Sequence, residues 1–328
     1  MENRTELTLK VDHLSVGIKT KNGIMKPVND ISLAIPRGKV VGIVGESGCG
    51  KSMTARAVMG LLPSAAKVTG GSILLDGNEV TGYSEDQLCG VRGSEVSMIF
   101  QEPMTSLNPV IKVGRQVDEM IRVHMKLPAG EARNRTIEIF RAVGISEPEE
   151  RYNCYPHQLS GGLRQRVMIA MAMIMKPSLL IADEPTTALD VTVEAQILRL
   201  MKELNRSGTS ILLISHNLGV IAQVCDYVYV MYTGQFVEKA DVFSLFDRPL
   251  HPYTKGLLEA VTSLRQEKDV LDTIPGIVPH LQDLPDGCSF AKRCGKCMEC
   301  CSALMPRMTE PERGHKVRCH LYNASTWR

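Results

Sequence analysis

The chain has 328 residues, of which 44% are hydrophobic and 23% are charged, with 27 glycines and 17 prolines. This is the composition of an ordinary globular protein, which excludes a low-complexity or disordered chain, and the length favours one large domain plus a smaller one. The formal net charge of +2 supplies no basic face, so we expect no nucleic-acid partner.

Neither the N-terminus nor the longest apolar run has the pattern of an export or membrane segment. The sequence MENRTELTLK has no apolar core after a basic start, which argues against a secretory signal. The apolar run at 167–175 is about half of the ~20 residues that a membrane-spanning helix needs. We therefore expect a cytoplasmic location.

The N-terminal part alternates between apolar and polar residues in the manner of strands. LTLKVDHLSV, a turn at TKNG and PVNDISLAI before PRG predict an antiparallel β layer. A continuous β-branched run at 40–44 then ends in a glycine-rich loop, and residues 52–62 have a helical pattern. This order predicts a strand, a loop and a helix.

The loop between that strand and that helix, GESGCGKS at 45–52, matches G-x-x-x-x-G-K-[ST] in the context that confirms a phosphate-binding loop. Its backbone N–H groups are expected to surround phosphate oxygens, Lys51 to reach the β- and γ-phosphates, and Ser52 to bind Mg²⁺. The nucleotide-binding residues predicted here are Gly45, Glu46, Ser47, Gly48, Cys49, Gly50, Lys51 and Ser52. A thiolate at Cys49, beside a helix N-terminus, would be prone to oxidation, although a small packed side chain is the simpler interpretation.

Helices dominate the next segment, from about 101 to 175, and two buried strands follow at 179–183 and 210–215 with a helix at 194–204 between them. Strands that alternate with helices predict a parallel sheet, so the fold class is α/β. Asp183 ends the first of these strands, where its carboxylate can hold Mg²⁺, and Glu184 beside it can act as the general base toward water. Apolar periodicity fades after residue 250, which places a domain boundary near 250–275.

The segment LSGGLRQR at 159–166 carries the resemblance: the chain resembles ATP-binding cassette ATPases. The resemblance implies a P-loop cassette with an antiparallel β subdomain and a helical subdomain at about 101–175. It assigns Gln101 to the loop that couples Mg²⁺ to that subdomain, 188–190 to the D-loop and His216 to the γ-phosphate switch. Ser160, Gly161 and Gly162 would contact ATP across a dimer.

Two positions depart from the family pattern. Leu163 follows the signature where glutamine is frequent, and Ile18 stands where an aromatic side chain usually stacks on adenine. The resemblance therefore leaves the adenine contact undefined.

Six segments resemble the oligopeptide and dipeptide importer ATPases, in particular their D-type subunits: 45–52, 101–109, 180–198, 251–261, 274–294 and 314–321. This resemblance implies residues 1–250 as the cassette and 251–328 as a C-terminal domain with a cysteine cluster. It also implies that two ATPs bind between paired cassettes, and that the second cassette is an F-type ATPase paralogue. The other implied partners are two transmembrane permeases and an extracytoplasmic binding protein. The implied location is the cytoplasmic face of the membrane, by peripheral association. An importer of nickel, opines or glutathione is an alternative, and a soluble cassette ATPase in nucleic-acid repair is a more distant one.

Six of the ten cysteines lie between 288 and 319, which in a reducing compartment favours a metal site over disulfides. The spacing of Cys294, Cys297 and Cys300 is that of bacterial ferredoxins, but Leu304 stands where a fourth cysteine is expected. The importer resemblance instead implies a [4Fe–4S] cluster, with zinc as the alternative metal and Cys297 and Cys300 as spares. Its ligands would be Cys288, Cys294, Cys301 and Cys319.

Overall fold

The computed structural model describes residues 6–21, 23–101, 106–186, 191–265 and 274–323. The chain divides into two compact units, each formed by separate stretches of sequence. Unit 1 comprises residues 1–10, 34–39 and 74–213, and unit 2 comprises residues 11–33, 40–73 and 214–328.

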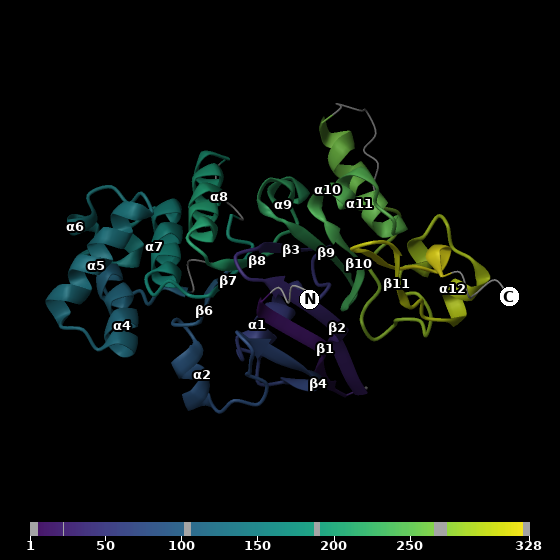
Figure 1. Ribbon diagram of the computed structural model, residues 1–328, viewed down its shortest axis with the longest axis horizontal. Coiled ribbons are helices and arrows are strands. Elements are labelled where there is room, and N and C mark those ends of the chain that lie inside the picture. Colours follow the sequence, from purple (N-terminus) through teal and green to yellow (C-terminus); the bar gives the residue numbers. More distant parts are fainter. Residues whose placement is uncertain (1–5, 22, 102–105, 187–190, 266–273, 324–328) are drawn as a thin grey trace. The chain divides into compact units, whose positions relative to one another are not determined.

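Unit 1 carries a parallel strand pair and a group of helices (Figure 1). Its elements are β5 (Asn78–Glu79), α2 (Glu85–Val91), β6 (Val96–Ile99), α4 (Val113–Met125), α5 (Ala129–Ala142), α6 (Pro148–Arg151), α7 (Gly161–Met173), β7 (Leu179–Asp183), α8 (Val191–Arg206) and most of β8 (Ser210–Ile214). The strands run in the order β8-β7-β6, and β6 pairs with β7 in parallel. Every residue of β7 and β8 is buried, which explains their continuous apolar sequence.

Helices α4, α5 and α7 pack against one another, as Figure 1 shows. Val113, Val117 and Ile121 recur every four residues on α4 and are fully buried, because this spacing places them on one face of a helix. The buried Asp118 carboxylate accepts hydrogen bonds from Thr136 on α5 (2.6 Å) and from the hydroxyl of Tyr152. Helices are therefore observed between 113 and 173, within the range predicted from sequence.

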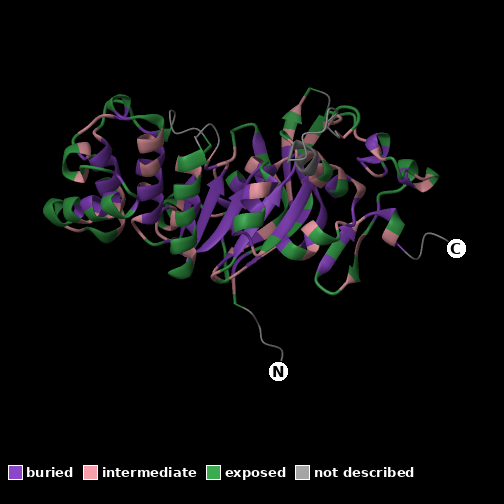
Figure 2. Ribbon diagram, turned by 90° about the horizontal axis from the view of Figure 1, so that it is seen from above, coloured by how far each residue is buried: buried purple, intermediate pink, exposed green. Residues whose placement is uncertain are grey.

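Unit 2 contains most of three long strands, β1 (Leu7–Thr20), β2 (Gly23–Pro36) and β4 (Ala66–Leu75), in the order β2-β1-β4. Its other elements are β3 (Val40–Val44), α1 (Lys51–Val58), α9 (Leu218–Val224), β9 (Tyr227–Tyr232), β10 (Gln235–Asp241), α10 (Val242–Asp247), α11 (Pro252–Arg265), α12 (Glu299–Ala303), β11 (Met308–Glu312) and β12 (His315–Arg318). Strand β9 pairs with β3 in parallel and with β10 in an antiparallel ladder. In Figure 2 the central strands are coloured as buried, in agreement with their apolar side chains.

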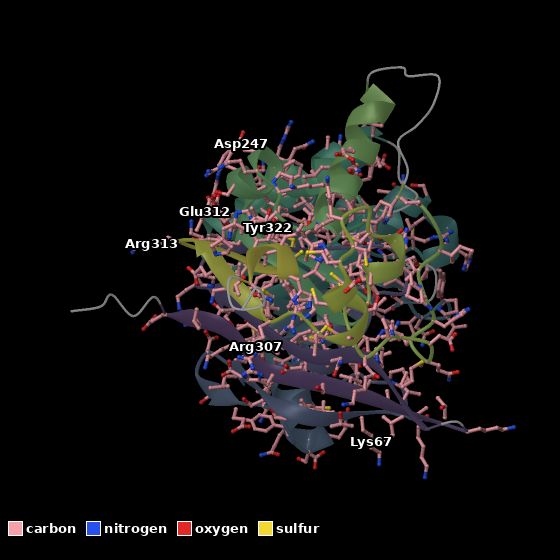
Figure 3. All side chains as sticks on the ribbon, turned by 90° about the vertical axis from the view of Figure 1, so that its right-hand side faces the viewer. Lys67, Asp247, Arg307, Glu312, Arg313 and Tyr322 are labelled. Carbon is pink, nitrogen blue, oxygen red and sulfur yellow. The ribbon has the colours of Figure 1, made fainter. Side chains whose placement is uncertain are left out.

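The C-terminal residues extend this second sheet. Strand β12 pairs with β10, with Glu238 opposite Val317, and β11 completes the edge. Glu312, labelled in Figure 3, forms an ion pair with Arg248 (3.1 Å), and the hydroxyl of Tyr322 donates to the carbonyl of Leu250 (3.3 Å). A separate small cysteine-rich domain is not confirmed, because β12 belongs to the same sheet as β10. The boundary predicted near residue 250 stays a prediction.

Candidate functional site

The loop at 45–52 leaves strand β3 and ends where α1 begins, in unit 2. Two of its glycines are required by close backbone approaches. A Cβ at Gly50, where φ is +108°, would lie 2.2 Å from the carbonyl oxygen of Pro27, and a Cβ at Gly45 would lie 2.2 Å from that of Met231. Glycine is therefore required at both positions, because any side chain there would clash with the backbone of β2 or β9.

Lys51, the first residue of α1, is 5% exposed. Its ammonium group donates hydrogen bonds to the carbonyls of Gly45 (2.8 Å) and Glu46 (3.0 Å). These bonds hold the charged group over the loop whose N–H groups are the expected phosphate ligands. Ser52 is the next residue of the helix and is half-buried.

Cys49 is packed within the loop and is 1% exposed. Burial raises the pKa of its thiol, and the nearby Lys51 ammonium offsets only part of that rise. A protonated, buried thiol is a poor nucleophile. The structure therefore favours the interpretation of Cys49 as a small packing residue over that of an oxidation-prone thiolate.

The side chain of Glu46 turns away from the loop toward residues that sequence analysis did not single out. Both of its carboxylate oxygens accept from Arg293, at 2.7 and 3.1 Å, and its backbone N–H donates to the hydroxyl of Tyr253 (2.9 Å). The hydrogen bond to Glu46 raises the pKa of Arg293 well above its usual range. No sequence signal predicts this pair, because Glu46 and Arg293 are 247 positions apart.

In unit 1, the parallel pairing of β6 and β7 brings two predicted residues into contact. Gln101 follows β6 and Glu184 follows β7, and the Gln101 amide donates to a carboxylate oxygen of Glu184 (3.0 Å). Asp183, the last residue of β7, is 3% exposed. Glu184 has a left-handed backbone conformation (φ +48°), which is uncommon for a residue other than glycine. Such conformations often occur at functional sites.

The signature residues lie at the N-terminus of α7 in the same unit. Ser160 caps this helix by accepting from the N–H of Leu163 (3.4 Å), and Gly161 is exposed. Gln165, one turn into α7, donates from its amide to the carbonyl of Pro185 (2.7 Å). This bond links the signature helix to the segment that directly follows Glu184.

His216 follows β8 and is exposed in unit 2, just before α9. The next residue, Asn217, caps α9 by accepting from the N–H of Gly219 (2.9 Å), so the position of the loop is fixed by hydrogen bonds. Ile18 is half-buried on β1. The predicted D-loop at 188–190 lies outside the described residues.

The predicted [4Fe–4S] cluster is wrong. Among the residues that the structure describes, no group of three or more His, Cys, Asp or Glu side chains could hold a metal ion, and the six clustered cysteines are free thiols. Burial raises the pKa of both Cys288 and Cys319 to about 11. Cys319 instead packs in an apolar cluster with Leu250 and Val317. The same finding gives no support to zinc.

Comparison with known proteins decides the family. Residues 28–187 match the ABC transporter family, and residues 237–301 match the C-terminal region of oligopeptide/dipeptide transporters. The oligopeptide transport ATP-binding protein AppD of Bacillus subtilis is 49% identical, over 96% of both chains. The chain is an ABC transporter ATPase.

Other relatives agree with this membership. The dipeptide transport ATP-binding protein DppD of Bacillus subtilis is 46% identical to this ATPase, over 96% of this chain and 95% of the relative. The oligopeptide transport ATP-binding protein OppD of Escherichia coli is 46% identical, over 93% and 90% of the two chains. Their names mention peptide transport and no iron–sulfur cluster.

The fold of the ATPase is that of a solved cassette. The dimeric, post-hydrolysis structure of the ATP-binding cassette MJ0796 bound to ADP and Pi matches it with a TM-score of 0.66 and 26% identity, over 71% of this chain and 98% of that chain. Within its described residues, this ATPase has no helix that is long and apolar enough to cross a membrane.

Proposed function

We propose that this ATPase is the ATP-binding and ATP-hydrolysing subunit of a membrane importer of dipeptides or oligopeptides. The observation that carries the proposal is the match of residues 237–301 to the C-terminal region of oligopeptide/dipeptide transporters, in the same chain as the cassette. The peptide-transport names of relatives that cover nearly the whole chain support it.

Binding of the phosphates is assigned to the loop at 45–52. The Lys51 ammonium would exchange its bonds to the loop carbonyls for bonds to phosphate oxygens. Ser52, Gln101 and Asp183 are the proposed Mg²⁺ residues, since hydroxyl, amide and carboxylate oxygens suit this ion. When bound, Mg²⁺ neutralises charge on the phosphates.

Hydrolysis is assigned to Glu184 as general base. A carboxylate oxygen of Glu184 takes a proton from the attacking water, while the amide of Gln101 orients the carboxylate through its hydrogen bond. Bond formation from water oxygen to the γ-phosphorus accompanies cleavage of the bond to the β-phosphate oxygen, which releases ADP and phosphate. His216 is proposed to contact the γ-phosphate.

The signature residues Ser160, Gly161 and Gly162 are proposed to bind the nucleotide of a second cassette. The exposed N-terminus of α7 supports this role, because free N–H groups at a helix N-terminus attract phosphate. The second cassette would be an F-type paralogue. We further propose that residues 1–250 form the cassette and 251–328 the transporter-specific C-terminal domain.

The remaining partners follow from the same proposal: two transmembrane permeases, an extracytoplasmic peptide-binding protein, and attachment of this ATPase to the cytoplasmic face of the membrane. The test is reconstitution in proteoliposomes with the permeases and binding protein encoded beside this chain, with and without the F-type paralogue. We expect ATP hydrolysis stimulated by a peptide mixture, together with uptake of labelled peptide.

The other hypotheses give different results in the same assay. Stimulation by nickel, an opine or glutathione, without any by peptides, would contradict the peptide proposal. Stimulation by DNA in the absence of permeases would point to nucleic-acid repair.

A further inference from the structure

Beside the phosphate-binding loop, unit 2 contains a cavity of about 620 Å³, a size typical of small-molecule sites. Ser47 and Gly48 of the loop form one wall, and Met25 of β2 forms another. The C-terminal segment 278–283, which includes His280, Gln282 and Asp283, forms the remaining wall. The cavity therefore adjoins the loop and is lined largely by residues far along the chain.

The C-terminal wall is fixed to the loop through Arg293. Its side chain is 5% exposed and binds both carboxylate oxygens of Glu46. Its Nε donates to the carbonyl of Pro275 (2.9 Å), which precedes the wall in the chain. A turn closed by the N–H of Asp283 and the carbonyl of His280 (2.9 Å) shapes the wall itself. Arg293 is thus a positioning residue that joins the two sides of the cavity.

The position and chemistry of the cavity indicate what it can hold. A nucleotide whose phosphates lie on the loop must place its ribose and base in an adjoining space, and the cavity adjoins the loop at Ser47 and Gly48. Met25 offers a thioether, which packs well against an aromatic ring. His280 is exposed and offers a flat ring, and Gln282 and Asp283 offer polar groups to ribose hydroxyls.

We propose that this cavity binds the nucleoside part of ATP, with His280 stacking on the purine. This inference rests on the proposed function and adds that the C-terminal segment 278–283 supplies the base contact. Ile18 offers no aromatic ring for that contact, and among the described residues the β layer contributes Met25 to the cavity instead. Nucleotide selectivity is therefore determined partly outside residues 28–187, the range of the cassette family match.

The test compares a ligand that has a base with one that has none. Calorimetry in the presence of Mg²⁺ measures the Kd of ATP and of inorganic tripolyphosphate for the full chain. We expect His280→Ala to weaken ATP binding about tenfold, as loss of one stacked ring does, and to leave tripolyphosphate binding unchanged. His280→Phe keeps a flat ring and is expected to retain the affinity for ATP.

Ile277→Ala is the matched control, because Ile277 is 90% exposed, directly precedes segment 278–283 and lies outside the cavity lining. It should change neither affinity. Equal ATP affinity in His280→Ala and the wild type, or equal weakening of both ligands, would overturn the inference. A wild-type chain that binds neither ligand would contradict the proposed function itself, and the inference with it.

Discussion

At the scale of single residues, the contact between Gln101 and Glu184 is the most direct clue to chemistry. A glutamine amide cannot take up a proton at neutral pH, so it can orient the carboxylate of Glu184 without competing for the proton of water. The proposed role of Glu184 as the base therefore predicts that the charge of its carboxylate, more than its shape, is essential.

Glu184→Gln keeps the shape of the side chain and removes the basic oxygen. We expect steady-state hydrolysis to fall at least about 100-fold, the usual contribution of a general base, while ATP still binds. Lys51→Ala should instead weaken ATP binding about tenfold or more, because it removes a charged hydrogen-bond donor. Phosphate release and ATP binding are measured on the same protein samples.

The control for these variants is Glu203→Gln, which removes an exposed carboxylate on α8. It should hydrolyse ATP at the wild-type rate. Near-normal hydrolysis by Glu184→Gln would show that another group takes the proton.

Cys49 gives a prediction on thiol reactivity. Since burial raises the pKa of Cys49, its thiolate fraction stays small at pH 8 and grows only at higher pH. Iodoacetamide at pH 8 should therefore modify the exposed Cys89 and leave Cys49 unmodified, as read by mass spectrometry of peptides. Modification of both cysteines at the same rate in the folded protein would contradict the burial argument.

At the scale of elements, the buried Glu238 of β10 joins three parts of unit 2. Its carboxylate is fully buried and accepts hydrogen bonds from the N–H groups of Leu250 (2.7 Å) and His251 (2.8 Å) and from the His315 ring on β12 (2.7 Å). One side chain thus links β10 to the segment before α11 and to the C-terminal hairpin.

Glu238→Ala leaves these donors buried without an acceptor. We expect the free energy of unfolding to fall by roughly 3 kcal/mol, the range for breaking a buried charged network. Urea denaturation measures it. Glu310→Ala on β11 is the control, since that carboxylate is 42% exposed and should change stability little. Equal stability of the two variants would mean that Glu238 contributes no more than a surface carboxylate.

At the scale of the whole molecule, the proposed arrangement makes activity depend on assembly. Each proposed ATP site takes its P-loop from one cassette and its signature residues from another, so a single chain supplies half of each site. We expect the isolated ATPase to turn over slowly, with specific activity that rises with protein concentration and rises further when the permeases and an F-type paralogue are present. Specific activity that is high and independent of concentration would contradict this arrangement.

Sequence alone was enough to predict individual strands and the phosphate-binding loop, because the patterns that specify them involve only neighbouring residues. Strand 40–44, the loop at 45–52 and strand 179–183 appear where the apolar runs and glycine spacing predict them. The family followed from the same motifs. A few neighbouring residues are enough to specify that a whole strand is buried, or that a backbone position accepts only glycine.

Contacts between distant residues were decided only by the tertiary structure. Three examples are the pairing of β12 with β10, the Glu46–Arg293 ion pair and the cavity wall at 278–283. Each brings together residues that are far apart in the sequence, and no sequence pattern relates them. The cysteines show how a local pattern can mislead, because their spacing in the sequence predicted a metal site and that prediction was wrong. Whether a thiol is a ligand or a packed core atom depends on what surrounds it in space, and Cys319 packs in one apolar cluster with Leu250 and Val317.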